Sequence, residues 1–148
     1  MGTKMWVLRV VLAFILAVVV ATVLGAVAHT QFVLARLSGL GVDISLGERL
    51  STTLHDIVGM APLFGAIVGS GFVVAMAAAA LVYRLAGIQR TLIYTVAGAI
   101  SLCVTLLVMN SVFEITAIAG ARSTLGFLAQ MAAGAIGGLT FAKALPAR

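Results

Sequence analysis

Few side chains in this sequence have the chemistry to bind a ligand or an ion, and most of them stand at the ends of long apolar runs. The candidates are His29, His55, Asp56, Asn110, Glu114, Arg122 and Gln130. If each apolar run crosses a bilayer once, four helix ends meet on the same outer face, and each brings a polar side chain. Gln130 lies further along the fourth run than Arg122, and therefore further inside the membrane.

This predicted polar cluster has three interpretations. It is structural if Glu114 and Arg122 pair across one loop while Asn110 links helices, because charges at a membrane interface cost little. It is a small-ligand site, or the mouth of a permeation path, if Asn110 and Glu114, four residues apart, line a route that Gln130 extends inward. It is a metal or haem site only if the two histidines act together, and no recognised spacing connects them. We therefore expect no metal and no cofactor.

Nothing in the sequence indicates catalysis. It contains no nucleophile elbow, no phosphate-binding loop and no dinucleotide fingerprint. Ser70, between two glycines, has no histidine at a comparable depth to activate it. Cys103 stands alone in an apolar run, which is typical of a small core residue. The sequence favours a non-enzymatic protein, and no residue string resembles a known family.

The elements that must position these residues are membrane spans. Hydrophobic residues make up 63% of the chain and charged residues 9%, with a mean hydropathy of +1.25. Such a composition excludes a water-soluble domain, and the scattered basic residues exclude a nucleic-acid partner. Uncharged runs at 10–28, 57–83, 91–113 and 123–142 are each long enough to cross a bilayer as a helix. We predict an all-α integral membrane protein, a single four-transmembrane-helix bundle over residues 1–148 with spans near 7–28, 57–83, 91–113 and 123–142.

The first run has a second interpretation. Lys4 and Arg9, the apolar stretch and the sequence Ala26-Val27-Ala28 are similar to a secretory signal with its cleavage site. We interpret this run as the first spanning helix.

The distribution of charge predicts the orientation of the chain. With four spans, one side of the membrane receives only basic residues: Lys4, Arg9, Arg84, Arg90, Lys143 and Arg148. The other side receives three basic residues and all four acids: Arg36, Arg49, Arg122, Asp43, Glu48, Asp56 and Glu114. By the positive-inside rule both termini are cytoplasmic, in the cytoplasmic (inner) membrane of a cell.

The connection between the first two spans, residues 29–56, is the only long one. Its Ser45-Leu46-Gly47-Glu48 sequence matches a capping box, which marks the start of a helix. The apolar residues after it recur every three or four positions, which predicts a short amphipathic helix at the outer interface. Pro62 predicts a kink before the second span, although a single bent helix is an alternative.

Small residues at a spacing of four predict the surfaces where helices approach one another. They are Ala17, Ala21 and Gly25 in the first span, Gly65 and Gly69 in the second, and Gly134 and Gly138 in the fourth. The third span offers fewer, Ala97 and Ser101. These stripes form contacts within the chain or a face for a second copy.

We therefore expect a non-enzymatic membrane protein, either an accessory or scaffold subunit or a self-associating bundle. Its partners would be the lipid bilayer and a second copy or another membrane protein. One alternative is a small transporter or channel lined by Asn110, Glu114 and Gln130 at the outer face. Another is a protein that binds a lipid or a quinone in an outer-leaflet groove beside the amphipathic helix.

Overall fold

The computed structural model describes residues 2–113 and 122–146 as four α-helices. They are α1 (Thr3–Gly39), α2 (Leu46–Ala86), α3 (Arg90–Phe113) and α4 (Thr124–Ala144), and the described residues contain no strand. All four are long and apolar enough to cross a membrane. The prediction of an all-α chain with four potential membrane spans is confirmed.

The first two helices are much longer than the predicted spans. α1 has 37 residues and α2 has 41, so at 1.5 Å per residue each extends about 55 to 60 Å. A bilayer core is only about 30 Å thick. α1 and α2 are therefore each longer than a single crossing of the membrane requires.

The amphipathic segment is not a separate short helix, which corrects that part of the sequence prediction. It is the first part of α2, which continues without a break through Pro62. The predicted capping box is present: the backbone N–H of Glu48 donates to Ser45 Oγ at 3.2 Å, and the backbone N–H of Ser45 donates to Glu48 Oε2 at 2.8 Å. The turn before it reverses the chain at Gly41, whose φ of 89° favours glycine.

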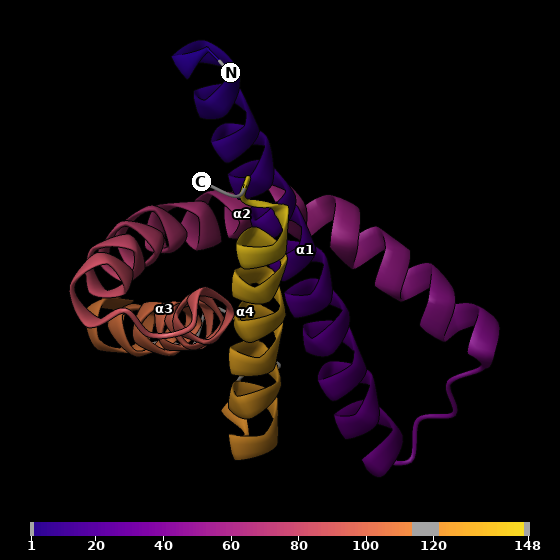
Figure 1. Cartoon of the computed structure of the whole chain (residues 1–148). Helices are drawn as coiled ribbons and strands as arrows, with labels where there is room; N and C mark the ends of the chain where they lie inside the picture. Colours follow the sequence, from indigo (N-terminus) through magenta and orange to yellow (C-terminus); the bar gives the residue numbers. More distant parts are fainter. Residues whose placement is uncertain (1, 114–121, 147–148) are drawn as a thin grey trace.

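Pro62 lies inside α2 and does not end it. Proline has no N–H to donate to the preceding turn, and its ring crowds that turn, so the helix axis deflects. Figure 1 shows α2 changing direction as it passes α1. Side-chain contacts with α1 on the N-terminal side of this bend, described below, hold the amphipathic part of α2 in place.

One core joins all four helices. Large side chains of α2 at a spacing of four share it with small side chains of α1: Phe64, Val68, Phe72 and Met76 with Ala13, Ala17 and Ala21. α3 and α4 meet through glycines, since a Cβ on Gly98 would collide with the carbonyl oxygen of Gly134. The helices do not share one axis, because Figure 1 shows α3 close to end-on and α4 along its length.

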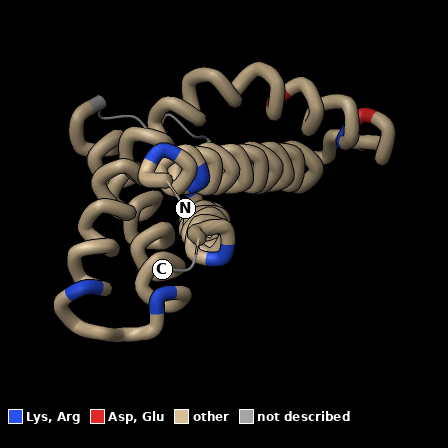
Figure 2. Tube along the Cα trace, turned by 45° about the horizontal axis from the view of Figure 1, so that its top comes forward, with Lys and Arg blue, Asp and Glu red and all other residues tan. Residues whose placement is uncertain are grey.

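Charges are separated along the molecule. The three described acids, Asp43, Glu48 and Asp56, belong to the turn after α1 and to the first part of α2. Figure 2 shows these acidic segments far from both chain ends, whereas most Lys and Arg segments gather on the side of the ends and of the α2–α3 turn. The charge pattern of the sequence is thus also a pattern in space.

Candidate functional site

Part of the predicted polar cluster forms a seam between α1 and α2. The hydroxyl of Thr30 donates to Asp56 Oδ2 at 2.8 Å, and Gln31 Nε2 donates to Thr53 Oγ1 at 3.0 Å. Arg49 Nη1 then donates to Gln31 Oε1 at 3.1 Å. These bonds connect the two helices in antiparallel register near the turn.

His29 adjoins this seam. Its imidazole is half-buried and lies close enough to Asp56 to interact with it electrostatically. Among residues 2–113 and 122–146, no three histidine, cysteine or acidic side chains are grouped so that they could hold a metal ion.

Gln130 occupies a different place, inside the helix packing. It is only 1% exposed, and its Nε2 donates to the carbonyl oxygen of Gly25 at 2.9 Å. Its Oε1 is buried with no hydrogen-bond partner among the described residues. Gln130 therefore links α4 to α1 directly.

The remaining candidates do not join these groups. His55, Asn110 and Arg122 are exposed, and Glu114 lies outside the described residues. Asn110 is exposed and Gln130 is enclosed, so these two side chains differ in their surroundings in the described structure.

The seven small residues chosen as packing surfaces all lie at contacts between helices of this chain. A Cβ on Gly25 would meet Phe64, one on Gly65 would meet Thr22, and one on Gly69 would meet Val18. Gly134 and Gly138 face backbone atoms of α3, and Gly137 approaches both Ala17 and Ala21. These stripes are therefore used within one chain.

One hollow in the described structure was not anticipated from the sequence. It is a cavity of about 690 Å³ at the end of the molecule where α1 and α3 begin and where α2 and α4 end. Ligand pockets typically measure about 300 to 1,000 Å³. Its walls come from all four helices: Trp6, Val10 and Phe14 of α1, Met76, Ala77, Ala80, Tyr83 and Arg84 of α2, Arg90 and Tyr94 of α3, and Phe141 of α4, with Leu145 and Pro146 beyond it.

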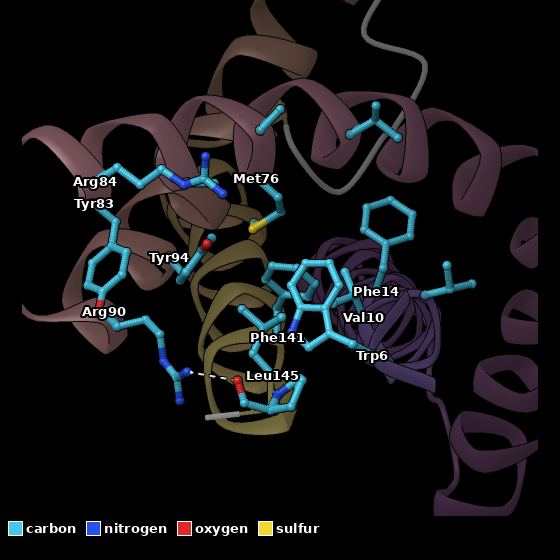
Figure 3. A pocket seen from close by; sticks show the side chains of 15 residues that line it. Trp6, Val10, Phe14, Met76, Tyr83, Arg84, Arg90, Tyr94, Phe141 and Leu145 are labelled. Carbon is cyan, nitrogen blue, oxygen red and sulfur yellow. Dashed lines mark hydrogen bonds between the residues drawn. The ribbon is translucent and has the colours of Figure 1, made fainter. Parts of the chain in front are cut away.

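The cavity has one polar side and one apolar side. Figure 3 shows Arg84, Tyr83 and Arg90 together at one side, and Phe14 and Val10 at the other. Tyr94 lies between them and is 5% exposed, with its ring edge-on to Phe141 at 5.2 Å between centroids. An apolar hollow with cations at one side suits a molecule with an apolar body and a negative end.

Sequence reasoning missed the cavity because its walls carry no distinctive pattern. Trp6, Val10 and Phe14 recur every four residues, but almost every face of the first span is apolar. Ala77 and Ala80 leave the space open, yet in the sequence they belong to an unbroken run of four alanines. The sequence did contain one signal, since Arg84 and Arg90 stand close to Tyr83 and Tyr94 on the two sides of one short turn.

Comparisons with known proteins add no relative: no family model matches the chain, and neither a curated protein nor a solved structure matches it.

Proposed function

We propose that this chain is a non-enzymatic, multi-pass membrane protein that holds a lipid-like amphiphile between its helices. The observation that carries the proposal is the cavity of about 690 Å³, whose wall is mostly aliphatic and aromatic. Ordered water needs two to four polar partners, and the aliphatic and aromatic part of the wall supplies none. In a bilayer, hydrocarbon chains are the abundant molecules that fill an apolar space.

The proposal includes an orientation. Four apolar helices and the concentration of Lys and Arg around the chain ends support four spans with both termini cytoplasmic, in the inner membrane. The cavity then opens in the cytoplasmic half of the bilayer. The first part of α2, with its exposed leucines and its acidic residues, then lies at the outer surface.

The other functions expected from the sequence receive less support. The small-residue stripes form contacts inside the chain, so they lend no support to a face for a second copy. The polar lining of a transporter would need Asn110 and Gln130 on one path, and their exposures differ. An accessory role in a larger membrane assembly stays a prediction from the sequence, and it is compatible with lipid binding.

The single tryptophan provides the test, because Trp6 lines the cavity. In vesicles of phospholipids brominated on the acyl chain, bromine quenches indole fluorescence at short range. We expect strong quenching of Trp6 in the parent protein and at least twofold weaker quenching in Ala80→Leu, which fills the cavity.

Ala78→Leu is the matched control. Ala78 belongs to the same run of alanines but is exposed and does not line the cavity. Equal quenching in the Ala80→Leu and Ala78→Leu variants would mean that no acyl chain enters the cavity, and the proposal would be abandoned.

A further inference from the structure

The two arginines at the cavity are brought together by one tight turn. Arg84 lies in the last turn of α2 and Arg90 is the first residue of α3. Between them Gly87 ends α2 with a φ of 61°, a conformation that glycine adopts without strain. Both arginines therefore line the same hollow, with the Arg84 side chain extending toward Tyr94 and the Arg90 side chain toward Leu145 (Figure 3).

Neither arginine is neutralised within the described part of the chain. Arg90 Nη1 donates to the carbonyl oxygen of Pro146 at 3.5 Å, which is a long and weak bond. A guanidinium has five N–H donors, so most of those on Arg90 stay available. The described acids all lie toward the opposite end of α1 and α2 (Figure 2).

We propose that the occupant of the cavity is an anionic phospholipid, with an acyl chain against Phe14, Met76 and Phe141 and its headgroup on Arg84 and Arg90. This inference rests on the proposed function above. Guanidinium groups bind phosphate oxygens through paired hydrogen bonds, which an ammonium group does less well. The cytoplasmic leaflet, toward which the proposed orientation turns the cavity, carries anionic lipid.

A zwitterionic phospholipid fits the same site less well. Its phosphate would meet the arginines, but its ammonium group would then lie near two positive charges. Aromatic faces such as those of Trp6, Tyr83 and Tyr94 attract cations, but two guanidinium groups beside them oppose that attraction. Among the described residues the cavity wall contains no carboxylate to receive an ammonium group.

The experiment measures headgroup preference with the same tryptophan. Brominated phosphatidylglycerol and brominated phosphatidylcholine are each titrated into vesicles of the unbrominated other lipid, and Trp6 quenching gives the relative binding constant. We expect the parent protein to prefer phosphatidylglycerol by tenfold or more. Each guanidinium in the cavity wall would contact the bound headgroup directly through charge-assisted hydrogen bonds, so Arg84→Gln and Arg90→Gln should each reduce the preference about fivefold.

Controls separate this site from general surface attraction. Arg9→Gln removes a charge at the same end of the molecule but outside the cavity wall, and we expect it to leave the preference within twofold of the parent. Arg84→Lys and Arg90→Lys keep the charge, so they should lose less than the glutamine variants and show that the fold tolerates the changes.

Three outcomes would overturn the inference. They are an absent or reversed preference in the parent protein, an equal loss in Arg9→Gln and the cavity variants, and displacement of quenching by oleate but not by phosphatidylglycerol. In each case a continuing difference between Ala80→Leu and Ala78→Leu would leave acyl-chain binding intact, so failure of the headgroup assignment is distinguishable from failure of the proposed function.

Discussion

Gln130 is the residue whose surroundings tell whether the interior of the helix bundle is packed protein or a water-filled path. Its Nε2 bonds to the Gly25 carbonyl, while its buried Oε1 has no partner among the described residues. Hydrogen bonds between membrane helices contribute about 0.6 kcal/mol on average, and an unsatisfied buried acceptor costs about 1 to 3 kcal/mol. The cost exceeds the gain, so Gln130 joins α1 to α4 without adding net stability.

We therefore expect Gln130→Met to leave the free energy of unfolding unchanged or to raise it by up to about 2 kcal/mol, since methionine keeps the shape while removing both the bond and the unsatisfied oxygen. Gln130→Glu should cost about 3 kcal/mol or more at pH 8, because a carboxylate would be enclosed without a partner. The loss should be smaller at pH 5, where the neutral carboxyl costs less to bury. Unfolding by SDS in mixed micelles, followed by Trp6 fluorescence, measures the stability of Gln130→Met and of Gln130→Glu at both pH values. If Gln130 instead lined a water-filled path, Gln130→Glu would be tolerated at both pH values.

At the scale of the helix, glycine decides how α3 and α4 meet. Gly98 and Gly134 approach so closely that a Cβ on either would collide with the carbonyl oxygen of the other, and Gly138 meets the Tyr94 carbonyl in the same way. Backbone atoms cannot rotate away as the end of a long side chain can. This contact therefore tolerates no added carbon unless the two helices separate.

Gly134→Ala and Gly98→Ala should each lower the free energy of unfolding by about 3 kcal/mol, the upper part of the usual range for overpacking. Gly59→Ala is the control, because Gly59 lies inside α2 with nothing near the added carbon. Alanine there should stabilise the protein by about 0.5 to 1 kcal/mol through its better helix propensity. The same SDS titration applies, and a Gly134→Ala variant as stable as Gly59→Ala would contradict the observed packing.

The sequence predicted those elements whose formation depends on neighbouring residues, and it did not predict features that depend on contacts between distant parts of the chain. The four apolar runs and the capping box at Ser45 were predictable, because lipid and helix ends impose local requirements. The continuity of α2 through Pro62 was left open, because a proline inside an apolar run is compatible with either a break or a bend. Gly98 was overlooked beside Ala97 and Ser101, because sequence alone does not give the rotation of a helix that is apolar on every side.

The same reasoning applies to the candidate site. Polar residues stand out in an apolar sequence, so the cluster of His29, Asp56 and Gln130 attracted notice, while the cavity beside Trp6 did not. A cavity forms where no side chain fills the space between helices. An alanine such as Ala80 is therefore the same in the sequence whether it faces a cavity or lipid. Only the positions of all four helices together distinguish it from Ala78.

At the scale of the whole molecule, the decisive property is that its two ends differ in charge. Acids and the polar seam lie near the turn between α1 and α2, whereas Arg84, Arg90 and the cavity lie near the chain ends (Figure 2). Transfer of clustered Lys and Arg across a membrane is disfavoured, so this difference should orient the chain during insertion. The cavity then faces the leaflet that carries the anionic lipid proposed as its occupant.

Single cysteines in a Cys103→Ala background test this arrangement in intact bacterial cells. Ser51→Cys, on the exposed first part of α2, should react with a membrane-impermeant maleimide added outside. Gln89→Cys, in the exposed turn between α2 and α3, should react only after the membrane is permeabilised. A complete reversal would keep four spans but place the cavity in the outer leaflet, against the proposed lipid. Labelling of both positions from one side would mean that α2 does not cross the bilayer, because these two positions flank its apolar stretch.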